Sequence, residues 1–82
     1  MYRARWSPDT ASYSGGLVPY GPLSLDPASQ VLNYGQSVFE GMKAQRSAAG
    51  RLVLFRPDRN AARLAAGAAR LSMPPVPADL FV

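Results

Sequence analysis

The sequence contains no cysteine and no histidine, and these two absences exclude a wide range of chemistry. Without cysteine, the 82 residues form neither a disulfide framework nor a thiolate metal site. Without histidine, they lack the commonest general base and the commonest metal ligand. The five acidic residues are scattered, with no pair spaced like a metal cage or a catalytic carboxylate dyad. We therefore expect no metal site.

Long apolar runs are missing as well. No stretch approaches the roughly 20 apolar residues that a helix needs to cross a bilayer. The first six residues contain two arginines, but no apolar segment of signal-peptide length follows them. These patterns predict a protein with no membrane partner and a cytoplasmic location. A chain of 82 residues also holds one small domain at most.

Positive charge, in contrast, is present in excess. The net charge is +4, and eight of the nine basic residues are arginine, whose planar fork binds phosphate or carboxylate through two hydrogen bonds. These arginines form no continuous basic run, and no nucleic-acid-binding signature is present. We expect an anionic ligand rather than a nucleic acid.

The pattern of apolar and turn-forming residues predicts an α+β chain with an antiparallel-rich sheet and packed helices. Strands or extended segments are predicted at residues 2–6, 17–20, 23–25, 31–34, 42–46 and 51–55. Residues 10–16 are small and polar, with a flexible turn predicted at Gly15-Gly16, and residues 47–50 are predicted as a hairpin loop. Residues 36–40 are predicted as one helical turn. Residues 52–55 are apolar on both faces, which predicts a strand covered on both sides inside a larger body.

One long helix is predicted to begin at Pro57 or Asp58, because proline is tolerated in a first turn and aspartate is a good N-cap. Its apolar stripe is narrow and rich in alanine, and residues 72–75 end it. Residues 77–82 then resemble the start of another helix, in which the apolar residues are the last three of the sequence. Because chain termini are usually exposed and polar, we expect the sequence to be a fragment of a longer protein.

Three features are candidate sites. Arg59 and Arg63 share a helix face near its positive end, which suits a phosphate, although a solvated arginine face without a ligand explains the spacing better. Tyr34 and Phe39 flank a glycine and either line a pocket or pack in a core. Lys43 is not expected to form a Schiff base, because nothing in the sequence indicates the burial or cationic neighbour that would lower its pKa.

Two longer stretches carry a family resemblance. Residues 23–46, LSLDPASQVLNYGQSVFEGMKAQR, and residues 52–74, LVLFRPDRNAARLAAGAARLSMP, resemble the N-terminal domain of branched-chain amino acid aminotransferases. These are pyridoxal-phosphate enzymes of the class IV aminotransferase group. The resemblance covers nearly the whole chain. It implies a partial small domain, residues 1–82, of the two-domain class IV fold, with the C-terminal domain absent.

The resemblance also implies roles for single residues. Arg63 matches the arginine that binds the phosphate of pyridoxal 5'-phosphate, while Tyr34 and Phe39 match aromatic residues that line the pocket for the branched substrate side chain. Lys43 does not match the catalytic lysine, which lies in the missing domain, so we expect no catalytic residue here and no activity from the fragment. Asn33 and Gln45 replace the histidine and tyrosine common in relatives, which leaves substrate preference open.

The implied reaction is transfer of the amino group of leucine, isoleucine or valine to 2-oxoglutarate by a homodimer or larger assembly. Two alternatives remain. One is another class IV enzyme, such as a D-amino acid aminotransferase or an aminodeoxychorismate lyase. The other is a non-catalytic anion-binding module.

Overall fold

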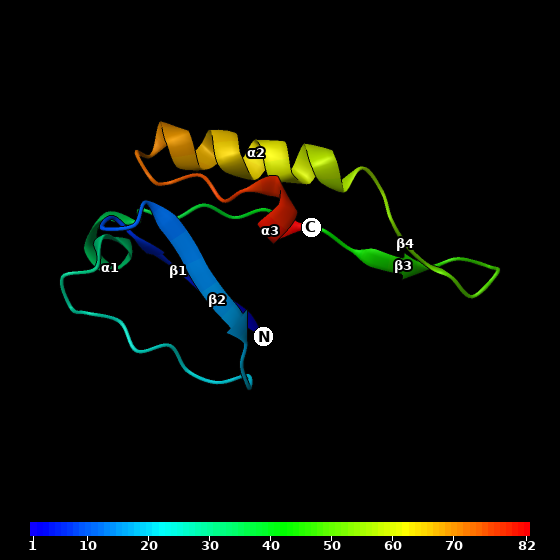
Figure 1. Cartoon of the computed structure of the whole chain (residues 1–82), viewed down its shortest axis with the longest axis horizontal. Helices are drawn as coiled ribbons and strands as arrows, with labels where there is room; N and C mark the ends of the chain where they lie inside the picture. The colour runs from blue at the N-terminus through cyan, green and yellow to red at the C-terminus, as the bar shows by residue number, and fades with distance from the viewer. The chain divides into compact units, whose positions relative to one another are not determined.

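The computed structural model describes all 82 residues and divides into two compact units, Met1–Gly35 and Gln36–Val82 (Figure 1). The secondary structure is α+β, as predicted, with two separate two-stranded antiparallel sheets. Its elements are β1 Tyr2–Ser7, β2 Ser12–Leu17, α1 Gln30–Tyr34, β3 Ala44–Arg46, β4 Leu52–Leu54, α2 Pro57–Arg70 and α3 Ala78–Phe81. The finer assignment to the class IV fold stays a prediction.

The first unit is built on the hairpin of β1 and β2. β1 was predicted, but β2 includes the residues assigned to a flexible turn, so that prediction was wrong. Backbone pairing from Tyr2–Leu17 to Ser7–Ser12 imposes the strand although serine and glycine favour it weakly. The rings of Trp6 and Tyr13, which are opposite each other, lie 5.1 Å apart and add cross-strand packing.

Two further predictions in this unit were wrong. Residues 31–34 were predicted to be extended, but they belong to the five-residue helix α1. The turn before it directs the chain into the helix: the Asp26 side chain accepts a hydrogen bond from the Ala28 amide, at 2.7 Å. Gly35, at φ 61°, then ends the helix in the left-handed conformation that glycine adopts without strain. Residues 23–25 form no strand, because no neighbouring strand supplies backbone partners.

The second unit contains the predicted hairpin of β3 and β4. Its loop turns at Gly50, whose φ of 77° is favourable for glycine. β4 was predicted to be covered on both faces inside a larger body, and within this chain Leu52, Val53 and Leu54 are all exposed, as is the following Phe55. No other element of the chain packs extensively on this hairpin, so these 82 residues leave its faces uncovered.

Helix α2 forms where the sequence predicted it and holds the small buried core of the chain. Ala61 and Ala68 are buried at one face, two turns apart. Pro57 occupies the first turn as expected, but the N-cap is Arg56 in a left-handed conformation rather than Asp58. The helix ends at Arg70, and the four-residue α3 packs against it. No helix of the structure has the length and apolarity that crossing a membrane requires.

Candidate functional site

Residues 36–41 lie alongside α2 and connect the aromatic and arginine motifs. Residues 36–40 were predicted as one helical turn, but the segment contains no regular secondary structure. The segment runs antiparallel to the helix, so that later residues of the segment contact earlier residues of α2. Gln36 Nε2 donates to the Leu71 carbonyl at 2.8 Å, Val38 Cγ1 lies against Gly67, and Glu40 contacts Arg63. The Gly67 contact is close, since a Cβ built there would lie 3.1 Å from the Val38 side chain.

The spacing of these contacts explains why the segment is extended. Two extended residues advance about 6.6 Å, and one turn of helix advances about 5.4 Å, so every second residue meets α2 about one turn further on. A helical turn at residues 36–40 would have broken this match. The alternation also places Phe39 between two residues that contact α2, and its side chain is exposed.

Glu40 is the centre of the polar contacts in this unit. Its Oε2 accepts a hydrogen bond from Arg63 Nε, and its Oε1 accepts one from Arg63 Nη2, both at 2.9 Å. Asn60 Nδ2 donates to Glu40 Oε1 and to the Gly41 carbonyl, both at 2.8 Å. Asn60 and Arg63 are three residues apart and therefore share a helix face. The network fixes the loop motif to the helix motif.

The charges in this network stabilise each other. Hydrogen bonds from Arg63 lower the pKa of Glu40 below its ordinary value, against the effect of burial, and Asn60 contributes in the same direction. Glu40 in turn raises the pKa of Arg63. The Glu40 side chain is only 11% exposed, whereas that of Arg63 is 62% exposed. The carboxylate is therefore an interior partner, and the guanidinium faces outward.

The Arg63 guanidinium retains donors for a ligand. Glu40 occupies the edge formed by Nε and Nη2, while Nη1 has no partner in the chain. The outer edge, Nη1 with the remaining Nη2 proton, is the second edge at which a guanidinium binds an oxyanion through two parallel hydrogen bonds. The residues present therefore fit a phosphate group such as that of pyridoxal phosphate.

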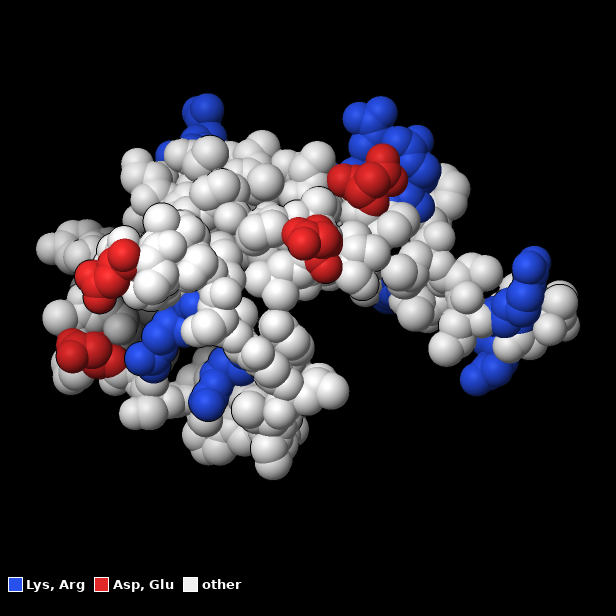
Figure 2. Space-filling model, in the orientation of Figure 1, with Lys and Arg blue, Asp and Glu red and all other residues white.

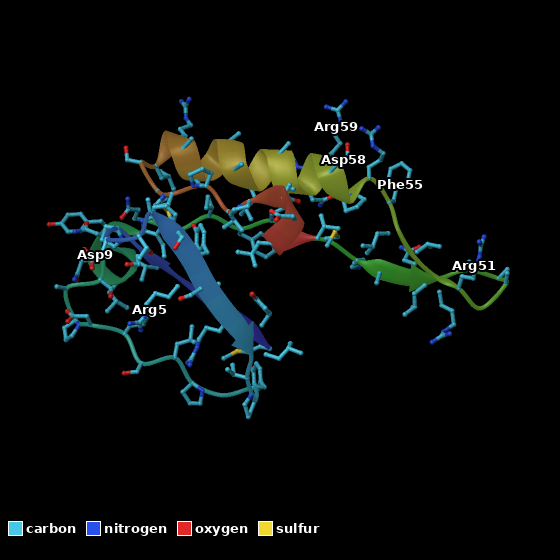
Figure 3. All side chains as sticks on the ribbon, in the orientation of Figure 1. Arg5, Asp9, Arg51, Phe55, Asp58 and Arg59 are labelled. Carbon is cyan, nitrogen blue, oxygen red and sulfur yellow. The ribbon has the colours of Figure 1, made fainter.

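The other arginines near the start of α2 have different partners. Arg56 donates to both oxygens of Asp58, at 3.0 and 2.9 Å, and lowers the pKa of that carboxyl group. Arg59 lies 3.9 Å from the same carboxylate, and the two side chains lie together at this end of α2 in Figure 3. The acidic and basic surfaces meet there in Figure 2. Asp58 thus partly neutralises the charge of these two arginines, and this acidic partner distinguishes them from Arg63.

The two aromatic candidates are both exposed. Tyr34 is the last residue of α1 and belongs to the first unit, whereas Phe39 belongs to the second. The Phe39 ring lies over Gly41, where an added Cβ would be 3.6 Å from the ring. Neither ring is packed in a core, so the core-packing alternative does not describe them in this chain.

Lys43 is exposed and has no ion-pair partner. No cluster of potential metal ligands is present. Sequence reasoning missed two residues, Glu40 as the partner of Arg63 and Asn60 as the buried amide that holds Glu40. The only signal for Asn60 was its position three residues before an arginine on the predicted helix, and Glu40 had no such signal.

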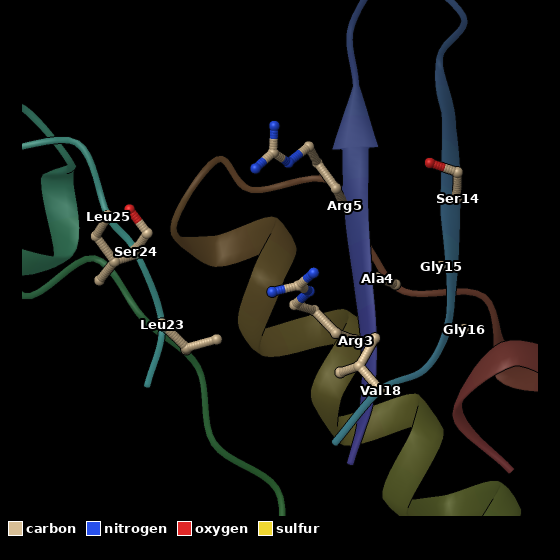
Figure 4. Close-up of a pocket in the computed structure, with 10 residues that line it drawn as sticks. All are labelled: Arg3, Ala4, Arg5, Ser14, Gly15, Gly16, Val18, Leu23, Ser24 and Leu25. Carbon is tan, nitrogen blue, oxygen red and sulfur yellow. The ribbon is translucent and has the colours of Figure 1, made fainter. Parts of the chain in front are cut away.

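The structure also contains an open cavity of about 590 Å³ in the first unit (Figure 4). Arg3 and Arg5 extend over it from β1, opposite residues 23–25. Neither arginine has an acidic partner. The residues that line the cavity include none of Tyr34, Phe39 and Arg63.

Comparison with known proteins gives the candidate site a family context. No family model matches the chain. A probable branched-chain-amino-acid aminotransferase from Streptomyces coelicolor is 48% identical over all 82 residues, and a branched-chain-amino-acid transaminase from Bacillus subtilis is 55% identical over 66. A methionine aminotransferase from Arabidopsis thaliana is 46% identical over the whole chain.

The matched regions are short relative to these proteins. They cover 100%, 80% and 100% of this chain, but only 23%, 18% and 23% of the three relatives. The chain thus spans less than a quarter of the length of the relatives that it matches. Within that span, the 82 residues are similar to the sequences of branched-chain-amino-acid aminotransferases.

Proposed function

We propose that the complete protein containing these residues is a pyridoxal-phosphate-dependent aminotransferase for branched-chain amino acids. It transfers the amino group of leucine, isoleucine or valine to 2-oxoglutarate. The observation that carries this proposal is the 48% identity to the aminotransferase of Streptomyces coelicolor along the entire chain. The Glu40–Asn60–Arg63 network supports it, because it brings together the two motifs on which the resemblance rests.

In this proposal Arg63 anchors the cofactor. When bound, pyridoxal phosphate supplies the electron-withdrawing ring on which transamination depends. The outer edge of the Arg63 guanidinium would hold the phosphate through hydrogen bonds, and its fixed positive charge would balance the phosphate charge. Because an arginine remains protonated at all working pH values, Arg63 holds the cofactor and transfers no proton.

Tyr34 and Phe39 line the substrate pocket in the same proposal. Both rings are exposed in this chain and therefore available to contact a ligand or further protein. An aromatic wall favours an apolar side chain by burying its surface, and the tyrosine hydroxyl adds one polar contact. Discrimination between side chains that differ by a methylene amounts to only about 1–3 kcal/mol. We therefore expect leucine, isoleucine and valine all to be accepted.

A substrate panel tests the proposed activity directly. The complete protein, saturated with pyridoxal phosphate, is incubated with 2-oxoglutarate and one amino acid, and glutamate formation is measured. We expect activity with leucine, isoleucine and valine and little with D-alanine. Methionine is included because one relative is a methionine aminotransferase. Activity with D-alanine alone, pyruvate release from aminodeoxychorismate, or no reaction with any substrate would refute the proposal.

The same proposal places the complete enzyme in the cytoplasm, in branched-chain amino acid biosynthesis, as a homodimer or larger assembly. The family resemblance is the support for these properties. Light scattering of the purified protein and fractionation of cells that express it are the corresponding measurements. A monomer that is fully active would contradict the proposed assembly. Recovery of the protein in an organelle fraction would contradict the proposed location, and this outcome is worth checking because one relative is named as chloroplastic.

A further inference from the structure

We propose that Glu40 is a positioning residue, which orients the Arg63 guanidinium so that its outer edge meets the cofactor phosphate, and that Asn60 holds Glu40 in place. This inference rests on the proposed function. It starts from one observation: Glu40 binds the inner edge of Arg63 through two hydrogen bonds of 2.9 Å and leaves Nη1 without a partner. The carboxylate thereby determines which edge a ligand can reach.

Such an orienting contact matters because an arginine side chain is long and flexible. The Arg63 side chain is 62% exposed, so little packing restrains it. An unrestrained arginine loses rotamer freedom when it binds a ligand, and that loss weakens binding. Two parallel hydrogen bonds to a fixed carboxylate set both the position and the plane of the guanidinium before the phosphate arrives. Binding then requires less ordering.

Glu40 is itself fixed by contacts on either side. Gln36 donates to the Leu71 carbonyl at one end of the segment, and Asn60 donates to the Gly41 carbonyl at the other. Asn60 also donates to Glu40 Oε1, and both Asn60 and the Glu40 side chain are largely buried. A buried carboxylate with three hydrogen bonds has few alternative positions. The ordered part of the network thus lies inside, and the phosphate-binding edge lies outside.

The experiment measures ligand affinity rather than turnover. The complete protein is prepared without cofactor and titrated with pyridoxal phosphate and, separately, with pyridoxal, which lacks the phosphate. We expect Arg63→Ala to weaken pyridoxal phosphate binding by about 10- to 100-fold and Glu40→Gln to weaken it by roughly tenfold. We expect pyridoxal binding to stay within about twofold in both variants, because in this proposal both residues act on the phosphate. Asn60→Ala gives a smaller loss with the same selectivity.

Two further variants isolate the positioning role. If Glu40 acts only through Arg63, the double variant Glu40→Gln/Arg63→Ala binds pyridoxal phosphate no more weakly than Arg63→Ala alone. Asp58→Asn is the matched control. It removes one negative charge from α2, the helix that carries Arg63, and Asp58 does not contact Arg63. We expect it to leave the ratio of the two affinities unchanged. A change equal to that of Glu40→Gln would mean that net charge, not orientation, sets the affinity.

Other outcomes would overturn the inference in distinct ways. If Glu40→Gln binds pyridoxal phosphate more tightly, Glu40 competes with the phosphate instead of positioning its anchor. If Glu40→Gln weakens both ligands equally, its role is structural only. Additive losses in the double variant would show that Glu40 acts independently of Arg63. If Arg63→Ala itself has no effect on pyridoxal phosphate affinity, the proposed phosphate site fails before the positioning role is reached.

Discussion

Glu40 is the residue through which two separate motifs of the chain contact each other. It lies in the segment Phe39-Glu40-Gly41-Met42-Lys43, yet its partners Asn60 and Arg63 are about 20 residues later on α2. The family resemblance predicted, from the sequence, that Arg63 is the phosphate-binding arginine. It did not reveal Glu40 as the partner, because an acidic residue and an arginine 23 positions apart carry no spacing signal. That pairing depends on the extended path of residues 36–41.

Asn60 offers the most direct test of this network at the residue scale. Replacing it by alanine removes the hydrogen bonds to Glu40 and to the Gly41 carbonyl and leaves both acceptors short of a donor. We expect Asn60→Ala to reduce the free energy of unfolding by about 1–3 kcal/mol in chemical denaturation. The matched control is Arg59→Ala, whose pair with Asp58 is exposed and long, and which should change stability by less than about 0.5 kcal/mol. Equal losses for the two variants would contradict the network.

The Glu40–Arg63 pair also predicts a pH dependence. Arg63 lowers the pKa of Glu40 from its ordinary value of 4.5 in the folded protein. The pair therefore stabilises the fold above about pH 4.5, and this stabilisation is lost as the pH falls through the lower folded pKa. We expect wild type to be more stable than Glu40→Gln near neutral pH, with the difference shrinking below pH 4.5. Thermal melts from about pH 6 to about pH 3 measure it, and a constant difference would count against the pair.

At the scale of elements, the reliability of sequence prediction follows the length and regularity of each pattern. Helix α2 was predicted because a long alanine-rich stripe, a proline in the first turn and a proline pair beyond its end all agree. The β3–β4 hairpin was predicted from two strand candidates, the second of them apolar, on either side of a glycine-containing loop. The short helix α1 and strand β2 were missed, because a turn at Asp26 and backbone pairing with β1 decide them. Neither the turn nor the strand pairing can be inferred from a short stretch of sequence.

The β1–β2 hairpin contains a pair of glycines that tests its geometry. A Cβ at Gly15 would lie 2.7 Å from the Ala4 Cα, its partner in the register, whereas a Cβ at Gly16 would meet nothing within 4 Å. Since the obstacle at Gly15 is backbone, the strands must move apart to accept alanine. We expect Gly15→Ala to destabilise the fold by about 1–3 kcal/mol and Gly16→Ala to be nearly neutral. Comparable unfolding midpoints for the two variants would contradict the register.

At the scale of the whole molecule, the main feature is exposed apolar surface. Leu52 is 70% exposed and Phe55 is 89% exposed, and only Ala61 and Ala68 are buried apolar residues. Continuous apolar surface of this kind usually marks an interface. The sequence predicted that residues 52–55 are covered, which is not the case within these 82 residues. The relatives are more than four times as long, so we propose that further parts of the complete protein cover this hairpin.

The exposed hairpin predicts how the 82 residues behave when expressed by themselves. We expect this chain to bind the dye ANS and to self-associate, because no element covers the apolar faces of β4. The complete protein should bind little dye. The variant Leu52→Ser/Phe55→Ser is the control, and we expect it to reduce dye binding by the isolated chain. A monomeric chain without dye binding would show that this surface is not an unfilled interface.

The measurement that tests the central claim most directly is the affinity of the complete protein for pyridoxal phosphate with and without Arg63. Arg59→Ala is the matched control, since Arg59 is one turn earlier on the same helix and pairs only weakly with Asp58. We predict that Arg63→Ala weakens binding by about 10- to 100-fold while Arg59→Ala stays close to wild type. Unchanged affinity in Arg63→Ala, or an equal loss in both variants, would contradict the assignment of Arg63 as the phosphate anchor.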